Sequence, residues 1–201
     1  YQAALIAWQE CSGWPVLADP LAAIPNGLRG VIRYWDLLLP NGLSQLPANA
    51  QVLRLGSMPA SRRLEAWLAS QQGPQLLITE GDPRPLDPLE VAQQWSGGLA
   101  QWWQQLSRQI NAIPSGASAP NPQTRSVLET WEKADAAVGK CISDLLPCQG
   151  AANEPALMVA LAQLLPAERP VMLAASSPVR DWQAFAAGDT GRRRCYSFRG
   201  A

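Results

Sequence analysis

"QVLRLGSMPASRRLEAWLAS" (residues 51–70) is the stretch that decides the fold class of this chain. Residues 51–56 form an almost continuous apolar run, which is typical of a strand that lies inside a parallel sheet and is covered on both faces. Ser61 then stands where a helix N-cap is favoured. The following residues place an apolar stripe on one face of a helix, formed by Leu64, Trp67 and Leu68. A buried strand followed by an amphipathic helix is the βα unit of α/β proteins.

Further strands and helices alternate on both sides of this unit. Residues 13–19 and 75–80 are bounded apolar runs that predict two more strands. Residues 31–39 have helical spacing, and residues 89–110 contain another helix. Alternation of this kind indicates a parallel sheet. We therefore predict an α/β fold in which residues 1–113 form a Rossmann-like domain with an open parallel sheet.

A second, shorter α/β pattern follows a linker. "PSGASAPNPQT" (residues 114–124) is rich in Pro, Ser, Ala and Asn and has no periodicity, as linkers do. The sequence after it predicts two helices, a strand, a short helix and a second strand, over about 125–146, 154–166, 171–176, 178–187 and 193–198. Two parallel strands cannot bury a sheet by themselves. We therefore predict that residues 125–201 are an incomplete second α/β unit.

The composition argues against several functional classes. The 16 basic and 16 acidic residues balance to zero, whereas a general nucleic-acid binder carries a basic excess. The chain has no histidine, which excludes Ser-His-Asp and Cys-His catalysis within it. No apolar run approaches the roughly 18 residues of a membrane span. The four cysteines form no C-x-x-C pair, and we expect reduced cysteines in a cytoplasmic protein. The arginine run at residues 192–194 predicts a solvated turn.

The loops after the first strands lack the motifs of nucleotide-binding sites. Residues 20–27 read "PLAAIPNG" and residues 56–61 read "GSMPAS", so neither supplies G-x-G-x-x-G. The P-loop and the G-x-S-x-G elbow are absent from the whole sequence. These observations favour a domain that serves as a structural scaffold over one that binds a nucleotide. They leave open a stand-alone Rossmann-like module that binds a nucleotide or an aromatic acid at its sheet edge.

Arginine and serine residues occur where predicted strands end and helices begin, which is the edge at which α/β proteins bind ligands. Arg62 and Arg63 could hold an anion there, or could be a solvated pair at a helix start. Ser176 stands beside helix N–H groups that attract anions, although a capping role fits it equally. Arg180 lies in a first helical turn, where a cation is unfavourable, so its position indicates function. Arg199 follows the last strand and reaches the same edge as Arg180.

Several segments resemble one enzyme family, in the same order along essentially the whole chain: "GWPVLADPLA", "YWDLLL", "VLRLGSMPASRRLEAWL", "SSPVRDWQAF" and "RGA". The family is the 2-succinyl-5-enolpyruvyl-6-hydroxy-3-cyclohexene-1-carboxylate (SEPHCHC) synthases, which are thiamine-diphosphate enzymes. The S-x-P-[IV]-R-D element followed by R-G-A is the most specific part of the resemblance. It implies a transferase of menaquinone or phylloquinone biosynthesis that adds the decarboxylated 2-oxoglutarate unit to isochorismate. The chain resembles the central of three α/β domains and the start of the pyrophosphate-binding domain.

The resemblance also assigns substrate-binding residues. Three positions match family residues at the active site, where the arginines help to hold substrate carboxylates: Ser176, Arg180 and Arg199. Arg62 and Arg63 match a basic pair that borders this site. The family usually has Asn where this chain has Ala175, and often Asn where it has Phe198. The detailed shape of this wall therefore departs from the family pattern.

The same resemblance implies which parts of the active site lie elsewhere. In the family, a G-D-G…N motif holds Mg²⁺ or Mn²⁺ and the diphosphate, and a glutamate of the first domain activates the cofactor. This sequence has no such motif, so we expect no catalytic residue, no complete cofactor site and no metal site here. We expect no bound cofactor and no activity from the chain alone. The parent protein would bind thiamine diphosphate with its metal ion and form a homodimer or homotetramer.

Two further expectations concern the extent of the chain and its relatives. The first and last residues look arbitrary, as they would in a piece of a longer protein. An enzyme of acetolactate-synthase type, whose central domain holds FAD, is a further alternative. The missing phosphate loop disfavours it.

Overall fold

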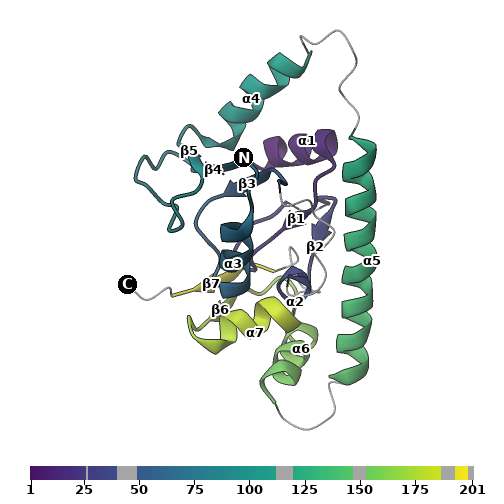
Figure 1. The fold of residues 1–201 in the computed structure, drawn as a ribbon. Helices are drawn as coiled ribbons and strands as arrows, with labels where there is room; N and C mark the ends of the chain where they lie inside the picture. Colours follow the sequence, from purple (N-terminus) through teal and green to yellow (C-terminus); the bar gives the residue numbers. More distant parts are fainter. Residues whose placement is uncertain (26, 40–48, 112–119, 147–152, 187–192, 199–201) are drawn as a thin grey trace. The chain divides into compact units, whose positions relative to one another are not determined.

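The computed structural model describes residues 1–25, 27–39, 49–111, 120–146, 153–186 and 193–198 (Figure 1). Its strands pair in parallel within one three-stranded sheet and two two-stranded sheets. The chain divides into two compact units. Unit 1 comprises Tyr1–Trp14 and Ser44–Leu128, and unit 2 comprises Pro15–Leu43 and Glu129–Ala201.

Unit 1 contains the three-stranded sheet, in the order β3-β4-β5. Its elements are β3 (Val52–Leu55), α3 (Arg62–Ser70), β4 (Gln75–Ile78) and β5 (Gln93–Trp95). Leu55, Ile78 and Trp95 are neighbours across the three strands and mark the end of each. The side-chain amide of Gln75 donates a 2.8 Å hydrogen bond to the carbonyl of Leu68, which fixes α3 to β4. Strand β3 followed by α3 is the βα unit predicted from residues 51–70.

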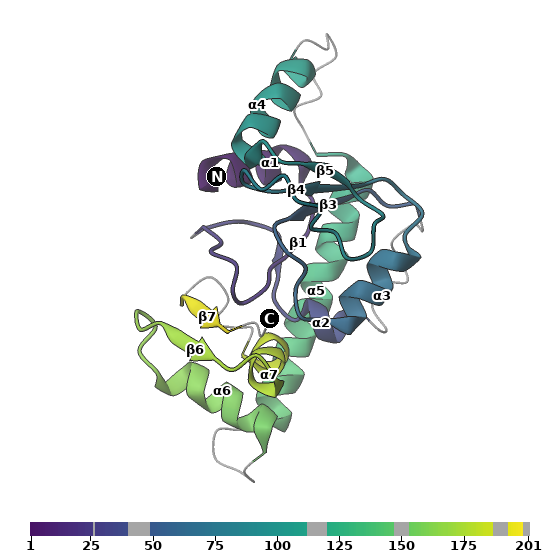
Figure 2. The ribbon, with the colours of Figure 1, turned by 90° about the vertical axis from the view of Figure 1, so that its left-hand side faces the viewer.

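Two further helices belong to unit 1, α1 (Gln2–Ser12) and α4 (Gly98–Asn111). Helix α1 lies beside the start of α4 (Figures 1 and 2). Leu5 and Trp8 are the buried apolar residues of α1. The ring of Trp8 meets that of Trp14 edge-on, with 5.5 Å between centroids. The sequence predictions include no counterpart of α1.

The first part of unit 2 is a small parallel sheet joined to a long helix. Its elements are β1 (Val16–Leu17), β2 (Val31–Ile32), α2 (Trp35–Leu38) and α5 (Pro122–Leu145), whose first turns lie in unit 1. The buried indole N–H of Trp35 donates to the Ala18 carbonyl at 3.0 Å. The carboxylate of Asp135, on α5, accepts a 2.7 Å hydrogen bond from the backbone N–H of Tyr34. The first bond ties α2 to the segment after β1, and the second holds the start of α2 against α5.

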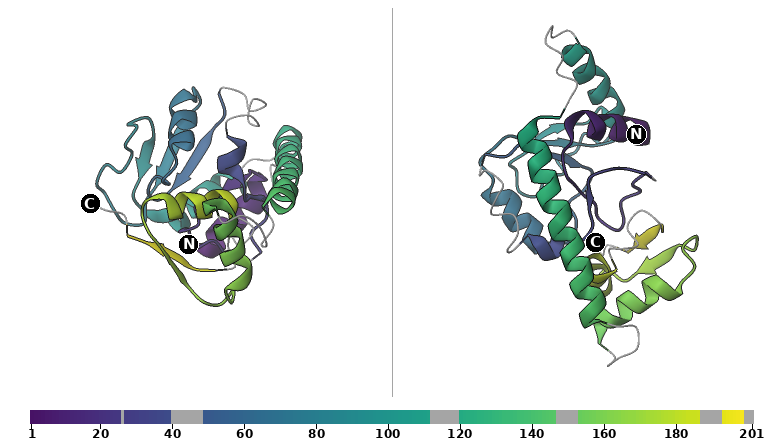
Figure 3. Two further views of the ribbon diagram at one scale, coloured as in Figure 1. Left: turned by 90° about the horizontal axis from the view of Figure 1, so that it is seen from below. Right: turned by 90° about the vertical axis from the view of Figure 1, so that its right-hand side faces the viewer.

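The second part of unit 2 is a βαβ unit with a further helix. Its elements are α6 (Glu154–Leu164), β6 (Val171–Leu173), α7 (Ser177–Phe185) and β7 (Cys195–Ser197). Helices α6 and α7 pack against each other, and β6 pairs with β7 (Figures 2 and 3). The core between them consists of Met158, Leu173, Val179, Trp182, Ala186 and Cys195. This part confirms the predicted alternation of residues 154–198.

Some element boundaries differ from the predictions. The helix predicted over residues 31–39 is wrong at its start, because Val31 and Ile32 pair with β1 and form β2; β-branched residues fit a paired strand well. The linker predicted over residues 114–124 is wrong at its end, because α5 begins at Pro122. Asn121 accepts a 2.9 Å hydrogen bond from the N–H of Gln123 and so caps this helix. Residues 114–119 lie outside the described residues.

The two units divide the chain differently from the predicted boundaries of 1–113, 114–124 and 125–201. Pro15–Leu43 belongs with the C-terminal part, and Leu21 packs against the apolar core between α6, α7 and β7. The α/β class with parallel strands is confirmed. The strands of the N-terminal half form two sheets rather than one, and the assignment of residue ranges to family domains stays a prediction. In the described part of the chain, no helix combines the length and apolar character needed to cross a membrane.

Candidate functional site

The start of α7 carries two of the predicted site residues. Ser176 occupies the N-cap position, but its side chain makes no capping hydrogen bond. Arg180 is exposed in the first turn of the same helix. A cation there does not stabilise the helix. The helix therefore brings a hydroxyl and a guanidinium together, and neither is used to build the helix end.

A neighbouring polar cluster fixes this first turn. The hydroxyl of Ser177 donates a hydrogen bond to a carboxylate oxygen of Asp181, one turn along α7. It also lies 3.4 Å from Glu154, the first residue of α6. The cluster links the N-termini of α6 and α7. Neither Ser176 nor Arg180 takes part in these contacts.

Arg193 is a functional candidate that the sequence reasoning missed. The predicted solvated turn at residues 192–194 is wrong at this residue, because only 7% of Arg193 is exposed. Its guanidinium donates to backbone carbonyls between α6 and β6 and lies 6.0 Å from the ring centroid of Trp182. Arg194 is exposed, as predicted, and Arg192 lies outside the described residues. The local sequence carries no signal that separates the buried arginine from its exposed neighbour.

The start of α3 carries the second predicted pair. Ser61 is the N-cap, as predicted, and accepts a 3.1 Å hydrogen bond from the N–H of Leu64. Arg62 and Arg63 are the first two residues of the helix and both are exposed. Gly56, which ends β3, has φ +76°, a conformation that L side chains rarely adopt. The predicted strand, turn and helix are confirmed here, whereas the role of the arginines stays a prediction.

A buried ion pair ties β3 to the loop between β4 and β5. Arg54 Nη1 lies 2.7 Å from Asp87 Oδ1, and both side chains are almost fully buried. Neither Nη1 nor Nη2 makes a hydrogen bond to a described residue, so the contact with Asp87 is an ion pair. Burial alone would raise the pKa of Asp87. The hydrogen bond from the Ala92 N–H and the positive charge of Arg54 together outweigh burial, so the pKa of Asp87 is lowered.

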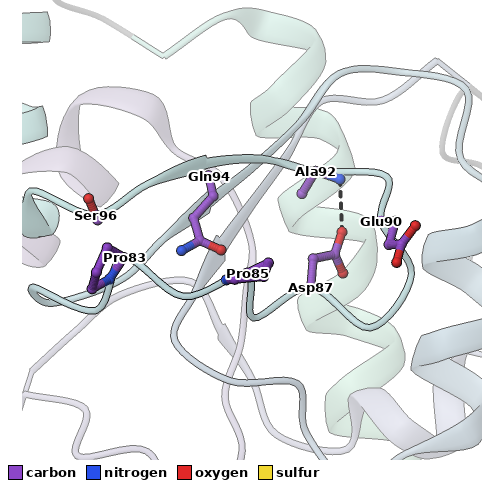
Figure 4. Close-up of a pocket in the computed structure, with 7 residues that line it drawn as sticks. All are labelled: Pro83, Pro85, Asp87, Glu90, Ala92, Gln94 and Ser96. Carbon is purple, nitrogen blue, oxygen red and sulfur yellow. Dashed lines mark hydrogen bonds between the residues drawn. The ribbon is translucent and has the colours of Figure 1, made fainter.

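In the cavity beside this ion pair, the side chains of Asp87 and Gln94 already have hydrogen-bond partners in their own loop. The cavity has a volume of about 350 Å³ and is lined by Pro83, Pro85, Asp87, Glu90, Ala92, Gln94 and Ser96 (Figure 4). Asp87 also accepts hydrogen bonds from the N–H groups of Leu89 and Val91. The Gln94 amide accepts from Leu86 and donates to the carbonyls of Asp82 and Arg84. The main polar groups of its lining therefore bind their own loop.

The glycine pair before α4 could suggest a phosphate site, but a side chain of the protein fills it. Glu80 Oε1 accepts a 3.0 Å hydrogen bond from the N–H of Leu99, in the first turn of α4. A Cβ on Gly98 would lie 2.5 Å from the other carboxylate oxygen. The anion that this helix terminus attracts is thus the carboxylate of Glu80. This observation disfavours a nucleotide module that uses α4.

The structure describes four of the five predicted site residues, and they fall into two groups. Ser176 and Arg180 lie together in unit 2, and Arg62 and Arg63 lie in unit 1. Arg199 lies outside the described residues. Among the residues that the structure describes, no three His, Cys, Asp or Glu side chains could share a metal ion. The residues that the structure describes do not fit the metal-bound diphosphate of thiamine diphosphate, so none of them is assigned to it.

Comparison with known families settles the kind of domain. The family model described as "Middle domain of thiamine pyrophosphate" matches residues 1–173. The chain belongs to this thiamine pyrophosphate middle-domain family. The match continues past residue 113, the predicted end of the central domain, and takes in α5, α6 and β6.

Similar proteins carry one name, 2-succinyl-5-enolpyruvyl-6-hydroxy-3-cyclohexene-1-carboxylate synthase. Over its whole length this middle-domain chain is 76% identical to that of Synechococcus sp. (strain CC9311). It is 57% identical to that of Synechococcus sp. (strain WH7803) and 52% identical to that of Prochlorococcus marinus (strain MIT 9313). The matches cover 35%, 34% and 34% of these proteins, so the chain spans about a third of the length of the curated relatives it matches. The resemblance noted in the motifs is confirmed.

Proposed function

We propose that the full-length protein containing this chain is a thiamine-diphosphate-dependent transferase, a SEPHCHC synthase. It would add the decarboxylated 2-oxoglutarate unit to isochorismate in menaquinone or phylloquinone biosynthesis. The observation that carries this proposal is the 76% identity to a synthase of that name along the whole chain. The start of α7 supports it, because Ser176 and Arg180 are presented there without a structural task.

The arginines give the chain a substrate-binding role. Both 2-oxoglutarate and isochorismate carry two carboxylates, and the planar guanidinium is the side chain that binds a carboxylate with two parallel hydrogen bonds. Arg180 and Arg199 would hold these carboxylates, and the hydroxyl of Ser176 would donate a further hydrogen bond. Arg62 and Arg63 would border the same site in the assembled enzyme.

The cofactor would be held by other parts of the full-length protein. Thiamine diphosphate, when bound, supplies the decarboxylation of 2-oxoglutarate and carries the remaining unit, and Mg²⁺ or Mn²⁺ would bind its diphosphate. No residue described in this chain is assigned to either group. The full-length protein would be a cytoplasmic homodimer or homotetramer, and the chain alone would be inactive.

Substitution of Arg180 in the full-length protein tests the assignment. Arg180→Ala removes a charge-assisted carboxylate contact, so we expect kcat/KM for the dicarboxylate substrates to fall by about ten- to a hundred-fold. The loss should lie mainly in KM, because the contact is present in both the bound substrate and the transition state. Arg108→Ala, at an exposed arginine of α4, is the matched control and should leave kcat/KM unchanged. An unchanged kcat/KM in Arg180→Ala would reject the role of this arginine.

A further inference from the structure

Arg193 uses both terminal nitrogens of its guanidinium on the backbone of unit 2. Nη1 donates to the carbonyls of Pro166 and Arg169, at 2.7 and 3.3 Å. Nη2 donates to the carbonyls of Ala162 and Leu165, at 3.3 and 3.0 Å. The four N–H bonds of the two nitrogens are all engaged.

Two of these carbonyls, those of Ala162 and Leu165, lie at the C-terminal end of α6, where a helix leaves carbonyls without intrahelical partners, whereas the Pro166 carbonyl also accepts from the Arg169 N–H. Ala162 lies in the last turn of α6, Leu165 is its C-cap, and the others belong to the turn that leads into β6. Helix α6 has no basic residue in its own last turn. Arg193 therefore supplies from a distant part of the sequence the donors that α6 lacks.

The same guanidinium also contacts α7. Its Cζ lies 6.0 Å from the ring centroid of Trp182, within the range of a cation–π contact. Trp182 is buried in the core of this part of unit 2 and lies two residues beyond Arg180 on α7. Arg193 itself lies two residues before the first residue of β7, the strand that precedes Arg199 in the sequence. One side chain thus links α6, the turn before β6, α7 and the start of β7.

We infer that Arg193 is a positioning residue, which holds α7 and β7 in the register that presents Arg180 to the substrate. It acts through Arg180 and does not touch the substrate. The expected effect on KM rests on the proposed function. The anchoring of α7 and β7 by Arg193 does not depend on it. Lysine cannot replace it, because one ammonium has three donors and lacks the planar fork that reaches four carbonyls.

The test uses the full-length protein with thiamine diphosphate and Mg²⁺. Arg193→Met keeps the apolar stem and removes the donors, and Arg194→Met changes the exposed neighbour as the matched control. We expect Arg193→Met to raise KM for the dicarboxylate substrates about tenfold, in keeping with the sensitivity of catalysis to small displacements. In an Arg180→Ala background the same change should cost less than about twofold, because the residue it positions is gone. Arg194→Met should have no effect in either background.

Two outcomes would overturn the inference. One is an unchanged KM in Arg193→Met, and the other is an equal loss with and without Arg180, which marks a general destabilisation. If Arg193→Met does not fold, Arg193→Lys is measured in the same two backgrounds, with Arg180 present and with Arg180→Ala. We expect it to raise KM by less than the tenfold expected for Arg193→Met.

Hydrogen exchange separates this inference from the proposed function. The amides of α7 and β7 should exchange faster in Arg193→Met and at the wild-type rate in Arg194→Met. If wild type shows no turnover, the proposed function fails, and the exchange rates still decide the anchoring role. Unchanged exchange in Arg193→Met overturns it.

Discussion

At the scale of single residues, two arginine–aspartate pairs show how burial determines the contribution of an ion pair to stability. Arg54–Asp87 and Arg84–Asp82 have the same 2.7 Å separation, but the first pair is buried and the second is exposed. Breaking a buried pair leaves an unpaired charge inside the protein, so we expect Arg54→Met to lower the free energy of unfolding by about 3 kcal/mol. Arg84→Met is the matched control and should cause no measurable loss, because water screens its pair. Urea unfolding of each variant measures the difference. Equal effects would contradict this account.

Asp135 provides a residue-scale prediction about pH. Burial raises the pKa of its carboxyl, against the opposing effect of hydrogen bonds from the backbone N–H groups of Tyr34 and Arg33. The folded state therefore holds the proton more tightly than the unfolded state does. The stability from this difference is fully present below the unfolded pKa of about 3.9 and is lost as the pH rises through the folded pKa.

Asp135→Asn should remove that loss, because the amide oxygen still accepts the hydrogen bond from Tyr34. We expect its free energy of unfolding at pH 7 to equal or exceed that of wild type, with a weaker pH dependence just above pH 4. Asp135→Leu is the comparison variant. It leaves the N–H of Tyr34 without its acceptor and should cost about 1–3 kcal/mol. If Asp135→Asn were as damaging as Asp135→Leu, burial would not be what raises the pKa.

At the scale of elements, the N-caps of α3 and α7 make opposite predictions. Ser61 accepts a hydrogen bond from Leu64, so Ser61→Ala should lower the free energy of unfolding by about 1 kcal/mol. Ser176 occupies the equivalent position of α7 without a capping bond. Ser176→Ala should therefore leave the unfolding midpoint unchanged and raise KM in the full-length protein. A stability loss in Ser176→Ala equal to that in Ser61→Ala would favour capping over substrate binding.

Local sequence signals explain which elements could be predicted. Strand β3 and helix α3 carry an apolar run, an N-cap serine and an apolar stripe, so each signal acts within a few residues. Strand β5 lacks such a signal, because Gln93 and Gln94 are polar and Gln94 serves the neighbouring loop. The start of α2 depends on Asp135, which lies about a hundred positions further along the chain. Long-range pairing of this kind is invisible to periodicity.

The candidate site was predictable to the same extent. Ser176 and Arg180 lie on one helix, and their spacing after a strand was enough to place them at its first turn. Arg193 could not be found, because its carbonyl partners lie 24 to 31 positions earlier in the chain. The pair Arg54–Asp87 has one local signal, a charged residue inside an otherwise apolar strand. The sequence alone does not identify Asp87 as the partner of Arg54.

At the scale of the whole molecule, we propose that the chain supplies part of an active site. It spans about a third of the length of its relatives, which are 52–76% identical to it in the three cases described. Its arginines can bind carboxylates, and no described cluster of acidic or sulfur ligands could hold a metal ion. The central claim is therefore that these arginines work in a full-length thiamine-diphosphate enzyme.

The assay that tests this claim most directly measures SEPHCHC formation by the full-length protein. It supplies 2-oxoglutarate and isochorismate, with and without thiamine diphosphate and Mg²⁺. We predict product only when both substrates and the cofactor are present, and none from the 201-residue chain under the same conditions. Absence of product from the folded, cofactor-supplied full-length protein would contradict the account.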